Sequence, residues 1–596
     1  MDKLRLIFAL FDTREKRQLV FVLAALLFIG FIELIGIGSI GPFISVVSNP
    51  KVIHANPYLN KVYTWFNFTS DAGFIIALGV AVIIVLVLSN LCLAAANFMI
   101  YYYSAKRRHT IAMRLFEQYL RQPYIFYLNT STADLSKRIL NDTGNFISSV
   151  LINVLQFISG SIISLCIIFL LIALNPVLAL IVSLVLGLSY SIIFSYVKDF
   201  LAKKGEEGNT QNFLKYKYIY DGFGGIKDIK ILGKEKVFLD FFAGPSKKSA
   251  MNEAARDIVN EMPKYLLETI AIGGILGVIL FMIHFGAVID DFLPVLTVYV
   301  FGAYRMLPLL QKVFKAAASI KYSFPIVEEL YRDFKELPPG NALIIKDIPR
   351  MSFHNHIDLE KIVFRYPTGN KDVIRNQSIT IASNTSVAFV GFTGCGKTTL
   401  ADIILGLLEP QSGKLYIDDV EITDDNRKNW QKNLGYVPQS IYLTDDTIRN
   451  NIAFGIESRM IDDQAVIKAA QLANIHDFIV TELEKGYDTI IGERGIRLSG
   501  GQRQRIGIAR AVYHDPSVLV LDEATSALDS LTENAIIDAI KNMSGKKTII
   551  MIAHRITTVK NCDMIYLMDT GIIADQGAYE ELYQKNEAFR KMADGV

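Results

Sequence analysis

A glycine-rich segment with a lysine and two threonines is the part of the sequence best suited to chemistry. Residues 391–399 read GFTGCGKTT and follow the apolar segment SVAFV. This matches the GxxxxGK[ST] phosphate-binding loop, in which backbone N–H groups surround phosphates at the N-terminus of a helix. Lys397 offers a cation to the phosphates, and Thr398 offers a hydroxyl to Mg²⁺. The predicted ATP-binding residues of this loop are Gly391, Phe392, Thr393, Gly394, Cys395, Gly396, Lys397, Thr398 and Thr399.

An acidic pair ends a second apolar segment, SVLVLDEATSALD, at residues 517–529. Adjacent carboxylates at a strand end can divide the work of hydrolysis. Asp522 is suited to hold the Mg²⁺ shell, and Glu523 to orient or deprotonate the attacking water. An isolated acidic pair is more often a solvated strand end, but the phosphate loop makes the catalytic interpretation the better one. The two motifs together predict an ATPase.

The elements around these motifs have the pattern of an α/β domain. Short strands rich in β-branched residues are expected at Ser386–Val390, Ser517–Leu521 and Lys547–Ile552, and helical segments alternate with them. That alternation is typical of a largely parallel core sheet. The segment LPPG at residues 337–340 reads as a linker because paired prolines cannot continue a helix. We therefore predict a first domain over residues 1–336 and the ATPase domain over residues 341–596.

Composition indicates that the first domain lies in a membrane. Of the 596 residues, 51% are hydrophobic and 20% charged, whereas a soluble chain carries about 25% charged residues. Residues 1–340 hold 33 Lys and Arg against 25 Asp and Glu, and the remainder hold 28 against 34. The basic residues cluster between apolar runs, which favours topology charges over a nucleic-acid surface. The four cysteines show no metal-ligand spacing, so neither zinc nor disulfides are expected.

Six apolar runs are near or above the ~20 residues that cross a bilayer. The first is longer than the core of a signal peptide and should remain as a membrane helix. The runs are Leu19–Val47, Phe74–Tyr102, Phe146–Leu174, Val177–Val197, Leu266–Phe285 and Phe292–Leu310. Residues 104–140 carry seven Lys and Arg and residues 196–256 carry twelve, whereas the alternate loops carry two or none. The excess of positive charge predicts that both termini and the ATPase domain face the cytoplasm.

The segment LSGGQ at residues 498–502 precedes a predicted helix, and with it the sequence resembles the ABC transporter superfamily. The resemblance implies that Ser499, Gly500, Gly501 and Gln502 contact ATP held by the opposite subunit. A helix N-terminus with a serine hydroxyl suits that role. Because each motif occurs once, two chains would be needed for a complete site, and a homodimer is the simplest assembly.

The same resemblance assigns further residues, each within a short motif. Gln439 in YVPQS corresponds to the glutamine that touches Mg²⁺ and water, and His554 in IAHR to the switch histidine. Tyr366 in FRYP corresponds to the aromatic that stacks on adenine, and Asp529 to the residue bridging the two ATPase domains. The predicted catalytic residues are then Glu523, His554 and Gln439, and the predicted Mg²⁺ ligands Thr398, Gln439 and Asp522.

Six spans ahead of the ATPase resemble the exporter-type half-transporter. Such a fold implies coupling helices in the cytoplasmic loops, here near Tyr124–Asp134 and Tyr220–Leu232. Ordinary loop connections are the alternative for these two segments. Coupling would link closure of the ATPase dimer to two alternative packings of the membrane helices.

A narrower resemblance concerns the membrane domain. FIELIGIGSIGPFISVVS (Phe31–Ser48) and YRMLP (Tyr304–Pro308) are similar to the bacterial lipid-linked oligosaccharide flippases of protein N-glycosylation. Members of that family move a polyprenyl-pyrophosphate oligosaccharide across the inner membrane, and basic residues of the cavity attract the pyrophosphate. The sequence departs from the pattern at Ser89, where a further arginine is expected, which leaves the sugar and the lipid open.

Three basic residues are the candidates for contact with this substrate. Arg305 and Lys312 are seven residues apart and share one face of the last span, and Lys264 begins the fifth. Cations at such depth are costly unless they face water or an anion, although Lys264 and Lys312 can also extend to the interface. An exporter of other lipids, drugs or peptides is the alternative function, and it predicts an uncharged cavity. The six spans exclude a soluble ABC protein.

An aromatic segment between the first two spans, Pro57–Phe68, is predicted to place four residues on one helical face: Tyr58, Val62, Trp65 and Phe66. It has the pattern of an amphipathic helix lying on the membrane. Aromatic residues also collect at any membrane boundary, so an ordinary aromatic belt is an equal alternative.

Overall fold

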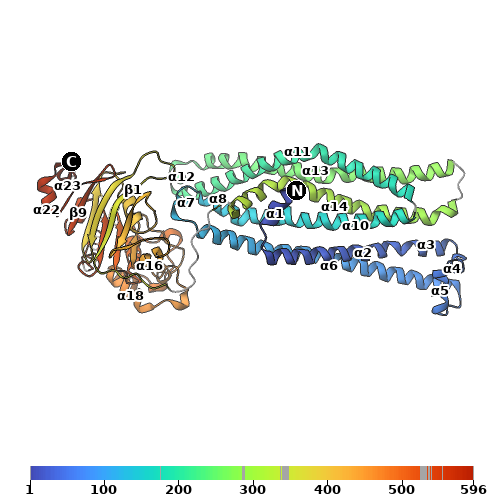
Figure 1. The fold of residues 1–596 in the computed structure, drawn as a ribbon, viewed down its shortest axis with the longest axis horizontal. Coiled ribbons are helices and arrows are strands. Elements are labelled where there is room, and N and C mark those ends of the chain that lie inside the picture. The colour runs from blue at the N-terminus through green and yellow to red at the C-terminus, as the bar shows by residue number, and fades with distance from the viewer. Residues whose placement is uncertain are drawn as a thin grey trace. The chain divides into compact units, whose positions relative to one another are not determined.

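The structure is a computed structural model that describes most of the chain. The described residues are 2–174, 176–284, 289–335, 337, 348–523, 533, 537–538, 540–541, 543–553 and 555–594. They form two compact units. The first comprises Met1–Gln122 with Phe126–Ala342, and the second comprises Leu343–Val596 with Pro123–Ile125. The two units are shown in Figure 1.

Within its described residues, the first unit consists of helices joined by short turns and loops. Its helices are α1 (Asp2–Ala9), α2 (Thr13–Gly38), α3 (Ile40–Ser48), α4 (Val52–Ala55), α5 (Pro57–Trp65), α6 (Asp71–Leu120), α7 (Tyr124–Leu128), α8 (Thr132–Lys137), α9 (Thr143–Asn145), α10 (Ile152–Leu174), α11 (Pro176–Gly224), α12 (Ile226–Leu232), α13 (Glu235–His284) and α14 (Ile289–Lys335). Two π-helical turns, Arg138–Asp142 and Phe146–Leu151, interrupt the stretch between α8 and α10. Residues 123–125, at the start of α7, belong to the second unit.

The long helices exceed what a bilayer needs. The helix α6 has 50 residues and α11 has 49, which corresponds to about 75 Å at 1.5 Å per residue, against ~30 Å of hydrocarbon. Within the described residues, four stretches are long and apolar enough to cross a membrane: 13–48, 71–120, 132–173 and 183–224. Helix α14 contains the sixth predicted run, and α13 contains the fifth as far as His284, because Phe285 lies outside the described residues. In Figure 1, α2 lies along α6, while α10, α11, α13 and α14 form a second group.

The first apolar run is broken rather than continuous. The sequence predicts one span over Leu19–Val47, but α2 ends at Gly38 and α3 begins at Ile40. Pro42 accounts for the break because it has no N–H to donate to the carbonyl of Gly38, four residues earlier. The two helices still form one apolar stretch.

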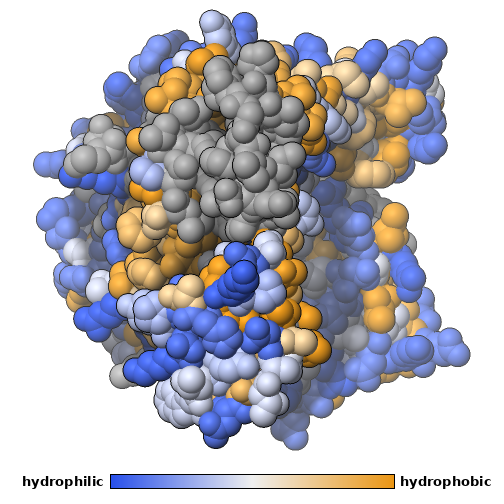
Figure 2. Space-filling model, turned by 90° about the vertical axis from the view of Figure 1, so that its right-hand side faces the viewer, coloured by the Kyte–Doolittle hydropathy of each residue, from blue (hydrophilic) through white to orange (hydrophobic). Residues whose placement is uncertain are grey.

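Many apolar side chains of the membrane unit are exposed. Only 39% of the first apolar window and 17% of the second are buried within the unit, and Phe21 and Phe28 of α2 are about two-thirds exposed or more, at 71% and 67%. Exposed apolar surface of this extent requires lipid or a protein partner. At the end of the unit where α4 and α5 lie, hydrophobic and hydrophilic residues are side by side (Figure 2).

The second unit contains two sheets. A four-stranded antiparallel sheet has the order β2-β1-β4-β5, and a six-stranded sheet has the order β10-β9-β3-β8-β7-β6. All pairs of the larger sheet are parallel except β9 with β10. The strands are β1 (His356–Phe364), β2 (Ile374–Ala382), β3 (Ser386–Gly391), β4 (Ser412–Ile417), β5 (Val420–Glu421), β6 (Leu434–Val437), β7 (Val518–Asp522), β8 (Thr548–Ile552), β9 (Met564–Asp569) and β10 (Ile572–Gly577).

Helices cover this core. They are α15 (Lys397–Ile404), α16 (Arg427–Gln431), α17 (Ile448–Ile452), α18 (Asp463–Leu472), α19 (His476–Thr481), α20 (Gly500–Val512), α22 (Tyr579–Lys585) and α23 (Glu587–Asp594). The three strands predicted from sequence match β3, β7 and β8 to within one residue at each end. Every residue of β7 is buried, as expected for a parallel strand covered on both faces. The predicted fold, a helical membrane domain with an α/β phosphate-loop domain, is confirmed.

Candidate functional site

The phosphate loop connects the carboxyl end of β3 to the N-terminus of α15. Parallel strands place their carboxyl ends at one edge of the sheet, which is where open α/β sheets bind ligands. The loop requires glycine at two points. Gly391 has φ +150°, and a Cβ there would lie 2.1 Å from the carbonyl oxygen of Met568; Gly396 has φ +103° and its Cβ would lie 3.0 Å from the carbonyl oxygen of Val373. The tight turn therefore leaves the backbone free to approach a phosphate.

Lys397 lies folded into the loop that it is predicted to serve. Its Nζ donates to the carbonyl oxygens of Gly391 at 2.8 Å and Phe392 at 3.1 Å. The side chain is only 5% exposed. The ammonium is thus held inside the loop by two backbone carbonyl oxygens.

Two buried carboxylates lie behind the loop. Asp522 ends β7, and Asp402, on α15, is 8% exposed. Burial together with the negative charge of Asp522 raises the pKa of Asp402 to about 6. Burial, then the charges of Asp522 and Asp402, also raises the pKa of Tyr436. The carboxylates of Asp402 and Asp522 thus repel each other, and Asp402 keeps its proton to a higher pH than an ordinary aspartate.

This donor set fits Mg²⁺. The carboxylate of Asp522, the hydroxyl of Thr398 and the side chain of Gln439 offer oxygen ligands, which are the ligands Mg²⁺ prefers. A nearby divalent cation would also relieve the repulsion between Asp402 and Asp522.

Asp402 gives the ATPase domain a defined pH dependence. Its folded pKa of about 6 lies above its ordinary value of 3.8, so the native state holds a proton between these pH values that the unfolded chain has released. This carboxyl therefore favours folding at low pH, and the contribution is lost as pH rises from about 4 to 6. We expect Asp402→Asn to raise the unfolding temperature at pH 7 relative to its effect at pH 4.

The measurement can follow Trp430 fluorescence. That indole is 0% exposed and donates to the carbonyl oxygen of Ile404, at the end of α15, at 2.8 Å. The other tryptophan, Trp65, is removed by Trp65→Phe. The matched control is Asp424→Asn, an exposed carboxylate on the same domain, which should shift unfolding equally at both pH values. An equal shift for Asp402→Asn would contradict the prediction.

Glu523 and Gln439 are in direct contact. The Nε2 of Gln439 donates to Oε2 of Glu523 at 2.5 Å, and the backbone N–H of Glu523 donates to the carbonyl oxygen of Ile552 at 2.9 Å. Glu523 has φ +49°, a left-handed conformation that costs a non-glycine residue about 1–3 kcal/mol. The two hydrogen bonds hold Glu523 at the carboxyl end of β7.

Two residues predicted from the motifs are beyond the described part of the chain. His554 and Asp529 both lie outside the described residues.

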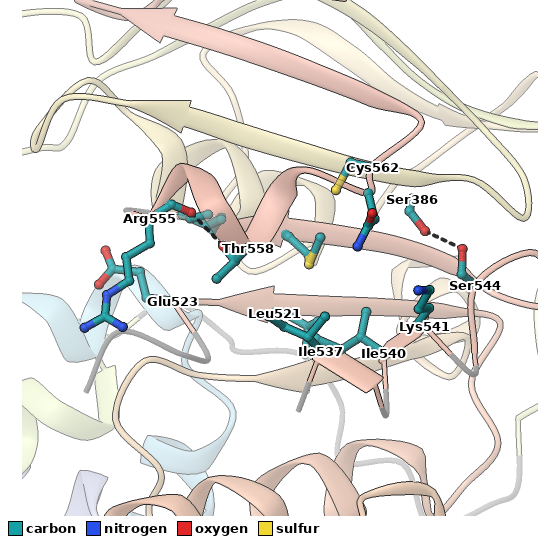
Figure 3. Close-up of a pocket in the computed structure, with 14 residues that line it drawn as sticks. Ser386, Leu521, Glu523, Ile537, Ile540, Lys541, Ser544, Arg555, Thr558 and Cys562 are labelled. Atoms are coloured by element: carbon teal, nitrogen blue, oxygen red, sulfur yellow. Dashed lines mark hydrogen bonds between the residues drawn. The ribbon is translucent and has the colours of Figure 1, made fainter. Parts of the chain in front are cut away.

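A pocket of about 60 Å³ adjoins Glu523 and is lined mainly by apolar side chains such as Leu521 and Ile540. In Figure 3, Glu523 and Arg555 are at one end of this pocket and the bonded hydroxyls of Ser386 and Ser544 are at the other. It is too small for a nucleotide.

Tyr366 lies against the helix that follows the phosphate loop. Its hydroxyl is 3.0 Å from Oγ1 of Thr399, and its ring meets the edge of Phe364 with centroids 5.0 Å apart. Tyr124, which belongs to the second unit, has its pKa raised by burial and then by the charges of Asp402 and Tyr366. A residue from the first predicted coupling segment is therefore close to the nucleotide site.

The LSGGQ segment forms the N-terminus of α20. Ser499 is the cap: its Oγ accepts from the N–H of Gln502 at 3.2 Å, and its own N–H donates to Oε1 of Gln502 at 2.8 Å. This reciprocal capping box stabilises the first turn. Ser499 and Gly500 are exposed, and beyond its own turn of backbone no atom lies within 4 Å of where a Cβ on Gly500 would be, while Gly501 is buried. The first turn of α20 is therefore exposed at Ser499 and Gly500.

The predicted substrate cations do not share one environment. Arg305 on α14 donates its Nε–H to Glu33 of α2 and its Nη2–H to Oδ1 of Asn90 at 2.9 Å. Lys312 donates to Oδ1 of Asn97 at 3.3 Å. The ammonium of Lys264 is instead 5.9 Å from the ring centroid of Tyr265. The structure brings Arg305 and Lys312 onto one face toward α6, and the described contacts do not include Lys264 in that group.

Known protein families match both the N-terminal and the C-terminal half of the chain. The family described as ABC transporter transmembrane region matches residues 19–248, and the ABC transporter family matches residues 374–526. An ATP-dependent lipid A-core flippase of Syntrophus aciditrophicus is 30% identical over 487 residues, which is 80% of this chain and 78% of that protein. The chain belongs to the ABC transporters. It is therefore a membrane ATPase whose hydrolysis drives transport.

Other relatives cover the transporter almost completely. An ATP-dependent lipid A-core flippase of Haemophilus ducreyi is 28% identical over 570 residues, 93% of this chain and 95% of that protein. The solved structure of a bacterial Atm1-family ABC exporter with ATP bound has a TM-score of 0.76 over 98% of this chain and 99% of its own, at 22% identity. At that identity the likeness establishes the exporter-type fold.

Sequence motifs missed several functional candidates of this transporter. Asp402 is five residues after Lys397 and could have been found as the acidic residue of the helix that follows the loop. Glu33 was visible as a lone carboxylate in the first apolar run, a pattern that indicates function by default. Asn90 and Asn97 carry no comparable signal, because the heptad spacing that matches them to Arg305 and Lys312 appears only when α6 and α14 are paired.

Proposed function

We propose that the transporter flips a polyprenyl-pyrophosphate oligosaccharide from the cytoplasmic to the outer leaflet of a bacterial inner membrane. The observation that supports this is the position of Arg305 and Lys312, which present two cations seven residues apart on the face of α14 toward α6. Guanidinium and ammonium groups in this arrangement suit a pyrophosphate, since guanidinium binds phosphate bidentately. Lys264 is the third proposed contact. Relatives that are lipid A-core flippases support a lipid as cargo.

One observation favours the alternative, an exporter of other lipids, drugs or peptides. Arg305 is paired with the buried carboxylate of Glu33. A neutralised cation attracts an anionic substrate less strongly than a free one, so a less charged cargo would also be compatible with this membrane domain.

We propose that hydrolysis uses Glu523 as the general base. Gln439 holds the carboxylate in place, Lys397 balances the charge of the terminal phosphates, and His554 completes the catalytic set. Thr398, Gln439 and Asp522 would hold Mg²⁺, which when bound supplies positive charge to the phosphates. Residues 391–399 and Tyr366 bind the nucleotide.

The proposed assembly is a homodimer with each ATP between two chains. The open N-terminal turn of α20, with Ser499, Gly500, Gly501 and Gln502, supports contact with a nucleotide held by the partner. Helix α12 also supports a dimer. Its side chains Ile231 and Leu232 are 72% and 65% exposed, and a second copy of the chain would cover them. We place the membrane domain at residues 1–336 and the ATPase domain at 341–596, with both termini in the cytoplasm.

The test is substrate-stimulated ATPase activity in proteoliposomes. We expect a polyprenyl-pyrophosphate oligosaccharide to stimulate wild type, and Arg305→Ala to raise the half-maximal lipid concentration at least about tenfold, because a charge-assisted contact is lost. Lys315→Ala is the matched control: Lys315 is on the same helix, pairs with Glu261 at 2.9 Å and is 50% exposed. Unchanged transport of the pyrophosphate lipid by Arg305→Ala would exclude the proposed contact.

A further inference from the structure

Glu33 is a buried carboxylate within the first membrane span. Its side chain is 2% exposed, and each oxygen has a partner: Oε1 accepts from Nε of Arg305 and Oε2 accepts from Oγ of Ser89. A charge at this depth is costly unless it is paired. The carboxylate is thus held from two helices, by a cation on α14 and a hydroxyl on α6.

The neighbours of Arg305 differ from those of Lys312. Asn90 and Asn97 each accept one bond from a cation through Oδ1, at 2.9 Å and 3.3 Å. A neutral amide holds a cation without cancelling its charge. Glu33 does cancel the charge of Arg305, and the contacts described for Lys312 include no carboxylate. Of the two proposed substrate cations on this face, Arg305 is the one whose charge a described carboxylate neutralises.

A second ion pair with its carboxylate on α2 shows how a purely structural pair differs from a pair that a ligand can exchange. Glu15 of α2 pairs with Arg107, and these side chains are 6% and 4% exposed. Neither side chain of that pair is therefore accessible to a ligand. Glu33 is equally buried, but Arg305 is 29% exposed. Because two of the five guanidinium N–H groups are used for Glu33 and Asn90, the cation keeps an open side that can meet a second anion.

We propose that Glu33 is an internal counter-anion, which occupies Arg305 when no cargo is bound and is replaced there by a phosphate oxygen of an anionic lipid. The inference rests on the proposed function and adds a residue that sets cargo selectivity. The exchange makes and breaks only hydrogen bonds and an ion pair. A pyrophosphate, with more charge and two phosphoryl groups, competes with the carboxylate better than a monophosphate, and a neutral lipid cannot compete.

Ser89 has a defined part in this exchange. When Arg305 turns to the lipid, the hydroxyl of Ser89 remains as a donor to Glu33, so the buried carboxylate is not left bare. Tight packing keeps the hydroxyl in place: a Cβ on Gly36 of α2 would lie 3.0 Å from Oγ and 3.1 Å from Cβ of Ser89. Serine at this position, where the flippase resemblance leads one to expect arginine, is therefore consistent with an internal anion.

The experiment measures ATPase stimulation of the full-length protein in nanodiscs by farnesyl pyrophosphate, farnesyl monophosphate and farnesol. Glu33→Gln keeps the shape and removes the charge, which raises the fraction of Arg305 available to the lipid. We expect the half-maximal concentrations of the pyrophosphate and of the monophosphate each to fall about tenfold. Ser89→Ala should move them the opposite way, because the exchanged carboxylate loses its donor. Glu15→Gln is the control that should not lower them.

The outcomes separate the two proposals. A wild type that responds to farnesol as strongly as to the pyrophosphate would overturn the anionic cargo and this inference with it. If wild type responds selectively and Arg305→Ala loses the response, the cargo proposal stands; an unchanged or raised half-maximal concentration for Glu33→Gln would then overturn the counter-anion. Should Glu33→Gln fail to fold, Ser89→Ala decides the matter, since a constant or lowered value there also overturns it.

Discussion

Replacing Glu523 with glutamine is expected to lower steady-state ATP hydrolysis at least about 100-fold while leaving ATP binding in place, since a positioned general base contributes 10²–10⁴-fold. The amide cannot accept the proton of the attacking water. It keeps the size of the side chain and can still bond to Gln439, whose Nε2 is 2.5 Å from Oε2 of Glu523. Lys397 and the phosphate loop are unchanged, so the nucleotide should remain bound.

Phosphate release and nucleotide binding, measured on the same purified transporter, check both halves of this expectation. Glu409→Gln is the matched control, because Glu409 is a carboxylate of the same domain that is 72% exposed and pairs with Arg427 at the surface. It should hydrolyse ATP at the wild-type rate. Turnover by Glu523→Gln within a few-fold of wild type would remove Glu523 from the role of base.

The motifs of the proposed ATPase site could be recognised because their residues are close together in the sequence. The phosphate loop needs consecutive residues around Lys397, and its strand is an apolar run that parallel packing buries, so pattern and position agree. The same holds for Ser499, whose capping partner Gln502 is three residues away. In motifs of this kind the residues in contact are close together in the sequence, so the sequence alone specifies their local geometry.

The contacts around the proposed substrate cations were less predictable because they join helices that are distant in the sequence. The spacing of Arg305 and Lys312 establishes that they share a face, but not which helix that face meets. The partner of Arg305 is 272 residues earlier, at Glu33, and Lys264 does not join the pair in the described contacts. The acidity of Asp402 also escaped the sequence, because its pKa depends on burial beside Asp522.

Complementation between two defective chains is expected to show whether ATP lies between protomers. Lys397→Ala removes the phosphate-loop cation, and Ser499→Arg fills the open turn at the start of α20. In a shared-site dimer, one chain with Lys397→Ala paired with one carrying Ser499→Arg concentrates both defects in a single site and leaves the other intact. Placing both substitutions in one chain, with a wild-type partner, damages each site once.

The two arrangements therefore give opposite results in the two possible architectures. Dimers purified through a different tag on each chain are assayed for trapped nucleotide and for ATP turnover. For sites formed between chains, the separated substitutions retain one nucleotide-trapping site and the combined ones retain none. For sites contained within a chain, the combined substitutions would leave the wild-type chain active and the separated ones would leave none. Because Ser499 caps α20, its replacement also costs about 1 kcal/mol of helix stability, but this cost is the same in both arrangements and cannot reverse their order.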